Sequence, residues 1–206
     1  MNKLFSAFNK NVQTKKTPVV IVSGLPRSGT SMMMKMIVEG GLQALTDGLR
    51  QANSDNPNGY FEHESVKELS KGNLNWMKDA NGKAVKVISS LLEYLPSQHS
   101  YKIIFMERDL NEVLASQKKM LTNRNEKSTL NNIELKQQFQ EHLKTVKAWL
   151  VRQPNIEVLY VNFNEMMANP VPLCTRITNF IDLPMSIENM LTVPNKTLYR
   201  NRLENN

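Results

Sequence analysis

Eight consecutive residues, from Gly24 to Ser31, have the types and spacing of a phosphate-binding loop. They read Gly-Leu-Pro-Arg-Ser-Gly-Thr-Ser and lie between an apolar run and a helix-like run. The glycines let the backbone curl so that its N–H groups point at an anion, and the helix that starts there adds its positive dipole end. Thr30 and Ser31 can donate hydroxyl hydrogen bonds to phosphate oxygens. The predicted chemistry is binding of a phosphate-linked group.

The loop departs from that of nucleoside-triphosphate enzymes directly after its second glycine. Those enzymes place a lysine there, followed by Ser or Thr, whereas this chain has Thr30 and Ser31. Positive charge comes instead from Arg27, inside the loop. We therefore expect a single terminal 5′-phosphate with a leaving group beside Arg27, and we expect magnesium triphosphate to fit less well.

A second anion site is predicted at Arg108 and Ser116. The strand predicted from the apolar run 102–106 ends at Glu107-Arg108. Asp109 is placed to cap a helix, with Glu112 as its capping-box partner. Ser116 then lies about two turns along that helix. Alone, such an arginine is usually a surface ion pair and such a serine is uninvolved, but beside the loop they can face one anion.

Two segments resemble the sulfotransferases. PRSGTS at 26–31 is similar to their 5′-phosphosulfate loop, and IIFMERDLNEVLASQ at 103–117 is similar to the segment that binds the donor's 3′-phosphate; DNPNGYFEHE at 55–64 and VNFNEMMANP at 161–170 extend the likeness. The resemblance implies sulfuryl transfer from 3′-phosphoadenosine 5′-phosphosulfate (PAPS), without a metal, to a hydroxyl or amine. It implies that the donor is bound by these residues: Pro26, Arg27, Ser28, Gly29, Thr30, Ser31, Arg108 and Ser116.

The resemblance is incomplete at the catalytic base. Cytosolic sulfotransferases carry Lys-Thr-His on a strand, with the histidine as base; Lys86 matches the lysine, but Ile88 stands at the histidine's place. The candidates for another base are Asp47, Glu62, His63 and Glu64. Glu62 is the first choice because it follows an aromatic pair that could form a pocket wall, so the expected catalytic residues are Arg27, Lys86 and Glu62. No segment matches the family's late adenine-binding motif, although the basic tail 196–202 contains Tyr199.

The periodicity of the remaining chain predicts an α/β fold. Apolar runs predict strands, and 3.6-residue patterns between them predict helices. The expected architecture is a three-layer sandwich with a mostly parallel central sheet, of the P-loop nucleotide-binding type, preceded by a flexible tail at 1–17 and forming one domain over 18–206. The strands are expected at 18–23, 84–88, 102–106 and 157–163, and the helices at 30–39, 62–79, 109–121, 133–152 and 171–181.

Composition narrows the class of protein and its partners. The 206 residues carry a net charge of +7, which favours an anionic partner. No basic run with interleaved aromatics predicts nucleic-acid binding, and no apolar stretch reaches the ~20 residues of a membrane span. The polar N-terminus and the single Cys174 lead us to expect a cytoplasmic protein. The acceptor and the oligomeric state stay open, and the alternatives are a P-loop nucleotide or small-molecule kinase and a non-catalytic nucleotide-binding relative.

Overall fold

The computed structural model describes residues 17–195, with gaps at 54–55, 58, 124 and 127–130. The predicted N-terminal tail, apart from Thr17, and the basic tail 196–202 lie outside these residues. The division into a tail and one domain therefore stays a prediction.

A parallel sheet forms the centre of the molecule. Its order is β2-β1-β3-β4, so the first strand lies between the second and the third. All six residues of β1 are buried, which explains why this strand reads as a continuous apolar run. The predicted α/β class with a parallel sheet is confirmed. The strands are β1 (Val19–Gly24), β2 (Ala84–Lys86), β3 (Tyr101–Glu107) and β4 (Ile156–Asn162).

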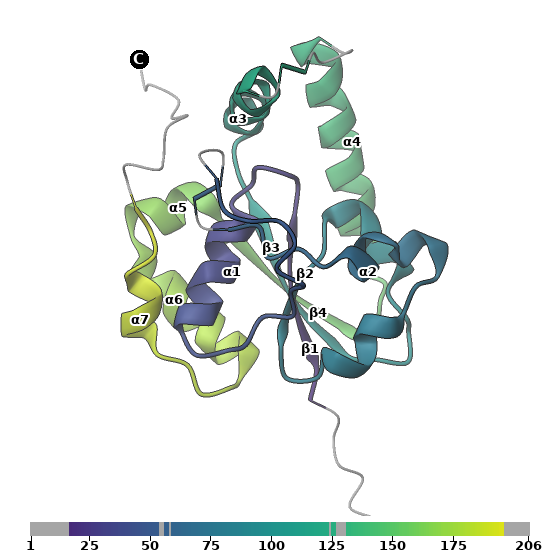
Figure 1. Cartoon of the computed structure of the whole chain (residues 1–206), viewed down its shortest axis with the longest axis vertical. Helices are drawn as coiled ribbons and strands as arrows, with labels where there is room; N and C mark the ends of the chain where they lie inside the picture. Colours follow the sequence, from purple (N-terminus) through teal and green to yellow (C-terminus); the bar gives the residue numbers. More distant parts are fainter. Residues whose placement is uncertain (1–16, 54–55, 58, 124, 127–130, 196–206) are drawn as a thin grey trace, which may run out of the picture.

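Helices cover both faces of the sheet (Figure 1). One face packs against α1 (Thr30–Glu39), α5 (Phe163–Ala168), α6 (Pro170–Ile181) and α7 (Ile187–Leu191). The other face packs against short helices that follow β1 and β2 in sequence and against one end of α4 (Asn132–Leu150). Alternate residues of β1 serve the two cores: Val20 and Val22 face the first, Val19 and Ile21 the second.

The longest connection projects from the body as a helical hairpin. α3 (Leu110–Asn123) starts directly after β3, and α4 returns toward the sheet (Figure 1). The C-terminal half of α4 joins the core: Leu150 is buried in it, and Leu143, Val146 and Trp149 pack against it. Among the described residues, no helix combines the length and the hydropathy that crossing a bilayer would need.

The helix predicted at 62–79 is wrong in extent. The structure instead has α2 (Glu64–Lys67) followed by two short 3-10 helices, Leu69–Lys71 and Asn75–Asp79. Gly72 adopts a left-handed conformation with φ 79°, which ends the first of these helices and turns the chain. A third 3-10 helix, Ser89–Tyr94, follows β2. These short pieces pack against the second face of the sheet through Val66, Leu69, Trp76, Met77 and Leu92.

Candidate active site

The loop between β1 and α1 is held by its own hydrogen bonds. The hydroxyl and the backbone N–H of Ser28 both donate to the carbonyl oxygen of Leu25, at 2.7 and 3.2 Å. Arg27 has a positive φ of 71°, and Gly29 one of 100°. Ser28 is buried and does not line the pocket, whereas Pro26, Arg27, Gly29, Thr30 and Ser31 do. The side chain of Ser28 therefore shapes the loop, and its expected role in donor binding stays a prediction.

Gly29 is required where the loop meets α5. A Cβ atom built there would lie 2.5 Å from Cδ2 of Phe163, much closer than a normal contact. Its φ also lies in the region that L-residues rarely adopt. The glycine therefore allows the loop to approach the Phe163 ring.

We expect Gly29→Ala to reduce the free energy of unfolding by two separable effects. Left-handed backbone strain contributes about 1–2 kcal/mol, and overpacking against Phe163 adds about 1–3 kcal/mol. Gly41→Ala is the matched control, because Gly41 has a φ of 111° but nothing within 4 Å of the added atom. Urea denaturation of both variants measures the difference. Equal losses would contradict the packing role of Gly29.

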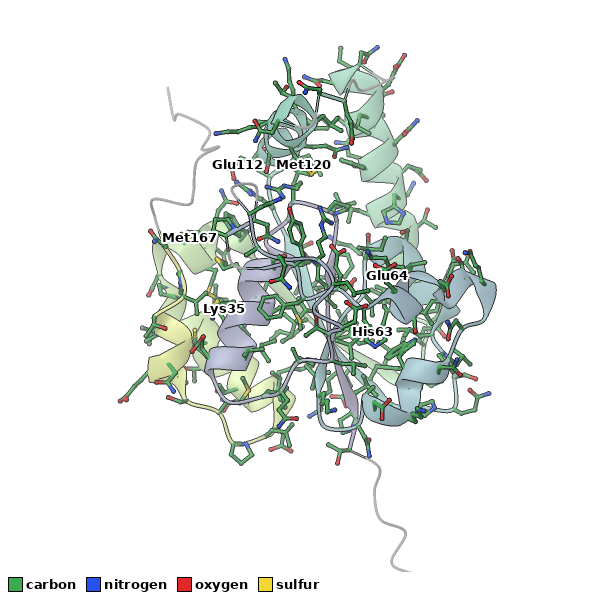
Figure 2. All side chains as sticks on the ribbon, viewed as in Figure 1. Lys35, His63, Glu64, Glu112, Met120 and Met167 are labelled. Carbon is green, nitrogen blue, oxygen red and sulfur yellow. The ribbon has the colours of Figure 1, made fainter. Side chains whose placement is uncertain are left out.

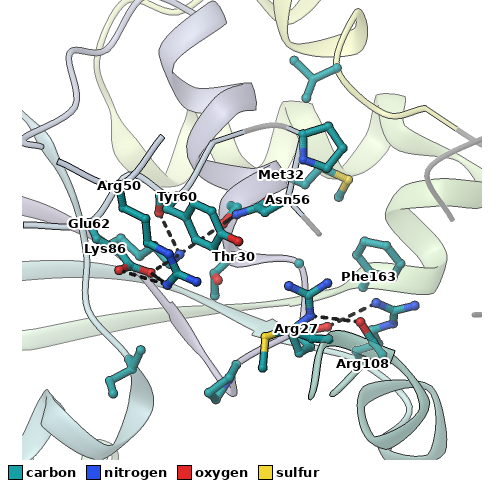
Figure 3. Close-up of a pocket in the computed structure, with 18 of the residues that line it drawn as sticks. Arg27, Thr30, Met32, Arg50, Asn56, Tyr60, Glu62, Lys86, Arg108 and Phe163 are labelled. Atoms are coloured by element: carbon teal, nitrogen blue, oxygen red, sulfur yellow. Dashed lines mark hydrogen bonds and ion pairs between the residues drawn. The ribbon is translucent and has the colours of Figure 1, made fainter. Parts of the chain in front are cut away.

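One end of the pocket contains the two predicted anion-binding arginines. Nε of Arg27 donates to Oγ of Ser116 at 3.0 Å, and Nη1 of Arg108 donates to the carbonyl oxygen of Arg27 at 3.1 Å. The Arg108 guanidinium also lies 4.3 Å from the centre of the Phe163 ring. The structure thus brings the loop, the end of β3 and the helix after it together, as the sequence predicted (Figure 3).

Glu112 fixes the orientation of Arg108. Its carboxylate, only 2% exposed as a side chain, accepts from Nε of Arg108 at 2.9 Å and from Nδ2 of Asn164 at 3.0 Å. The sequence predicted Glu112 as the capping-box partner of Asp109. Asp109 does cap α3 by accepting from the N–H groups of Asn111 and Glu112, but the Glu112 side chain points to Arg108 instead. A buried arginine is a stronger partner than an exposed backbone N–H.

Lys86 stands at the other end of the loop. Its ammonium donates to Oγ of Ser31 at 3.1 Å and to the carbonyl oxygen of Tyr60 at 2.8 Å, and it lies 3.8 Å from Oε1 of Glu62. Burial, together with the positive charges of Arg50 and Arg27, lowers the pKa of Lys86 to about 8, although the Glu62 charge opposes this shift. The ammonium is thus the main species at neutral pH.

Glu62 is surrounded by cations. Besides Lys86, Arg50 lies 3.1 Å from one carboxylate oxygen and Lys67 lies 2.9 Å from the other. Burial alone would raise the pKa of Glu62, but the hydrogen bond from Lys67 and the charges of Lys86 and Arg50 together lower it below the usual value. The carboxylate is therefore ionised and able to accept a proton at neutral pH.

The four candidate bases fall into two groups. Glu62 and His63 line the pocket, whereas Asp47 and Glu64 do not. The Asp47 carboxylate accepts the backbone N–H groups of Leu49 and Glu64, and the Glu64 carboxylate pairs with Lys67 at 2.7 Å. His63 and Glu64 stand at the start of α2, and Figure 2 places them on the flank opposite Met167 of α5. Glu62 is the only one of the four that lies both in the pocket and beside Lys86.

Arg27 and Arg108 on one side and Lys86 and Glu62 on the other line one cavity of about 600 Å³. It lies at the carboxyl ends of β1, β2 and β3 (Figure 3). Sequence reasoning missed several of its lining residues: Arg50, Asn56, Tyr60 and Phe163. Three of them lie in the segments 55–64 and 161–170, so the family resemblance was a usable signal. Arg50 lies in a polar loop with no periodic or motif signal. Among the described residues, no group of three or more His, Cys, Asp or Glu side chains is placed to hold a metal ion.

The comparisons with known proteins agree with this geometry. The model of the sulfotransferase family matches residues 70–187, a range that includes Lys86, Arg108 and Ser116 but begins after the loop. No curated protein matches the chain by sequence.

Three solved structures share the fold. Mouse sulfotransferase SULT7A1 complexed with PAP is 18% identical, with a TM-score of 0.57 over 93% of this chain and 69% of that one. Retinol dehydratase in complex with androsterone and inactive cofactor PAP is 18% identical, with a TM-score of 0.50 over 87% of this chain and 63% of that one. The sulfotransferase domain from the curacin biosynthetic pathway is 12% identical, with a TM-score of 0.50 over 84% and 76%. At these identities the likeness establishes the fold.

Proposed function

The chain belongs to the sulfotransferase family, and from this premise we propose that it transfers a sulfuryl group from PAPS to a hydroxyl or amine acceptor. The observation that carries the proposal is the convergence of Arg27, Lys86 and Arg108 on one cavity at the carboxyl ends of the strands. Cations on both sides of the loop, Lys86 on one side and the neighbouring Arg27 and Arg108 on the other, suit a nucleotide with a 5′-phosphosulfate and a 3′-phosphate. PAP, the sulfur-free product of such a donor, is bound in two of the solved structures that share the fold.

The loop side of the site would hold the 5′-phosphosulfate. The Ser31 hydroxyl oxygen accepts from both Lys86 and Asn56, at 3.1 and 2.8 Å. Its own hydrogen is therefore left to donate to an anion in the cavity. The start of α1 adds backbone N–H groups and the positive end of the helix dipole. Arg108, held in place by Glu112, and Ser116 would hold the 3′-phosphate at the other end.

PAPS supplies an activated sulfuryl group, attached to an oxygen of its 5′-phosphate. The acceptor oxygen or nitrogen forms a bond to sulfur while the bond from sulfur to that phosphate oxygen breaks, leaving adenosine 3′,5′-bisphosphate. Arg27 and Lys86 stabilise the negative charge that grows on the departing phosphate. Glu62 takes the proton that the acceptor loses. The chain's residues thus provide the cations and the base that in-line displacement at sulfur needs.

Calorimetric titration with adenosine 3′,5′-bisphosphate beside Mg-ATP tests the proposal. We expect tight binding of the bisphosphate without added metal and weak binding of Mg-ATP. Arg108→Lys is the informative variant, because it keeps a cation beside the buried Glu112 but loses the guanidinium fork. We expect it to weaken bisphosphate binding, whereas Arg152→Lys, an exposed change outside the pocket, leaves binding unchanged. Preference for Mg-ATP would show that the loop serves a triphosphate.

The affinity for the bisphosphate should fall as the pH rises through the pKa of Lys86, which is about 8. A lysine with a lowered pKa loses its charge from that pH upward, and the bound anion favours the charged form. We expect the affinity to fall roughly tenfold between about pH 7.5 and about pH 9.5. The phosphate groups are fully ionised over this range, because their second pKa is about 6.

The matched control for this pH dependence is Lys86→Arg, because arginine keeps its charge over the whole range. Its affinity should stay level where the wild-type affinity falls. The same decline in both proteins would assign the titration to a group other than Lys86.

We propose a cytoplasmic protein that uses no metal and binds no nucleic acid, with PAPS and an unidentified acceptor as its partners. Fractionation of the natural host cells and activity in the presence of a chelator would test the first two of these expectations.

A further inference from the structure

Arg50 occupies the acceptor end of the cavity. It lines the pocket on the Glu62 and Lys86 side, away from Arg108 (Figure 3), and its side chain is 37% exposed. In the arrangement proposed above, the donor's phosphates lie on the loop and at Arg108. The acceptor must then approach Glu62 past Arg50.

The Arg50 guanidinium is held as an open fork. Its carbon lies 3.5 Å from the centre of the Tyr60 ring, and that ring is itself buried and fixed by a hydrogen bond from its hydroxyl to Asn53. Nη1 alone donates to both Glu62 oxygens, at 3.1 and 3.4 Å. Within the described part of the chain, Nε and Nη2 make no hydrogen bond. A stacked guanidinium with free N–H groups is suited to bidentate binding of an oxyanion.

Transfer of the acceptor's proton to Glu62 would favour binding of an anion beside Arg50. In the resting site, three cations, Arg50, Lys67 and Lys86, face two carboxylates, those of Glu62 and Glu64, which leaves one excess positive charge. When Glu62 accepts the acceptor's proton, its charge disappears and the excess rises to two. A negative group on the acceptor, paired with Arg50, would return the excess to one. The same negative group would also reduce the electrostatic stabilisation of the Glu62 carboxylate by Arg50. The pKa of Glu62 would then rise, which makes the carboxylate a stronger base.

We propose that Arg50 is a specificity-determining residue that binds a carboxylate of the acceptor, so that the substrate class is a hydroxy or amino compound with a nearby carboxylate. This proposal rests on the proposed sulfotransferase function. The carboxylate pairs with the free edge of the Arg50 fork while the neighbouring hydroxyl or amine faces Glu62. The two groups must be close together in the acceptor, because Arg50 and Glu62 are in direct contact.

The test uses benzoate as the carboxylate probe and benzamide as its uncharged counterpart. Each is titrated by calorimetry into protein saturated with adenosine 3′,5′-bisphosphate, which covers the cations of the donor site. We expect benzoate to bind at least tenfold more tightly than benzamide. Arg50→Gln should remove this preference, Arg50→Lys should keep part of it, and Arg152→Gln, the same change at an exposed arginine outside the pocket, should keep all of it.

A transfer assay gives a second readout. With PAPS as donor, mandelate, whose hydroxyl is on the carbon that bears the carboxylate, should be sulfated with a higher kcat/KM than its methyl ester, and Arg50→Gln should reverse or abolish that order. Benzoate binding that is absent from the wild type, or unchanged in Arg50→Gln, would overturn the proposal. Failure of the bisphosphate to bind would instead contradict the donor site, so the two failures are distinguishable.

Discussion

Arg27→Ala is expected to lower kcat for sulfuryl transfer by about 10²–10³-fold, the usual effect of removing one preorganised group that stabilises charge in the transition state. Arg27 lies in the loop directly before α1 and donates through Nε to Ser116, so its guanidinium is fixed beside both predicted phosphate sites. A group fixed in this way needs no reorganisation when charge develops on the departing phosphate.

The backbone of this variant should be little changed. Arg27 has a φ of 71°, and alanine meets the same backbone strain as arginine because both carry a Cβ. The carbonyl oxygen of Arg27, which accepts from Arg108, is retained in the variant. The loss should therefore appear in kcat and not in the free energy of unfolding.

Single-turnover kinetics with saturating PAPS, together with urea denaturation, would measure these two quantities. Arg27→Lys is the graded variant, because it keeps the charge and loses the fork, and Arg152→Ala is the matched control on an exposed surface. An Arg27→Ala enzyme with wild-type kcat and weaker donor binding would assign Arg27 to ground-state binding alone.

The sheet and the loop could be predicted because their signals are local. β1 and β3 are buried on both faces, so each reads as an apolar run, and the glycine-containing turn follows β1 directly. The bounds of α1 agree with the prediction because Gly29 and Gly40 flank it at both ends. Ser116 was placed correctly because Asp109 caps α3 and so sets the phase of the helix.

Two side chains make hydrogen bonds that their position in the sequence does not reveal. The spacing of Asp109 and Glu112 is that of a capping box, yet Glu112 turns inward because Arg108 and Asn164 offer it buried partners. Ser28 has the residue type of a phosphate ligand, but its hydroxyl is used within the loop. Neither hydrogen-bonding arrangement can be predicted from the spacing of residues along the chain.

Arg50 illustrates the part of the site that no sequence pattern marked. It is 12 residues from Glu62 in the chain, in a loop without periodicity. In the pocket its guanidinium lies over the Tyr60 ring and contacts Glu62. The loop that carries it also contains residues outside the described part of the structure. Only the fold reveals that an arginine lines the cavity beside Glu62.

Glu62→Gln is expected to lower kcat by about 10²–10⁴-fold, the usual contribution of a positioned general base. The amide has the shape of the carboxylate, and its one carbonyl oxygen can still accept a hydrogen bond from Lys67 or Arg50, but it cannot take up the acceptor's proton. Because neighbouring cations lower the pKa of Glu62, the wild-type carboxylate stays ionised as the pH falls to the usual carboxyl range. Protonation of Glu62 should therefore cause no loss of rate between about pH 5 and about pH 7.

Two comparisons separate the base from the surrounding charges. His63→Gln alters the other candidate that lines the pocket and should keep most of the activity, while Glu64→Gln alters a carboxylate outside the pocket and should keep all of it. Bisphosphate affinity should be unchanged or higher in Glu62→Gln, because a negative charge near Lys86 has been removed. A large loss of kcat in His63→Gln, with activity kept in Glu62→Gln, would transfer the role of base to the histidine. A loss in Glu62→Gln accompanied by loss of bisphosphate binding would show that Glu62 organises the cations of the site and does not act as its base.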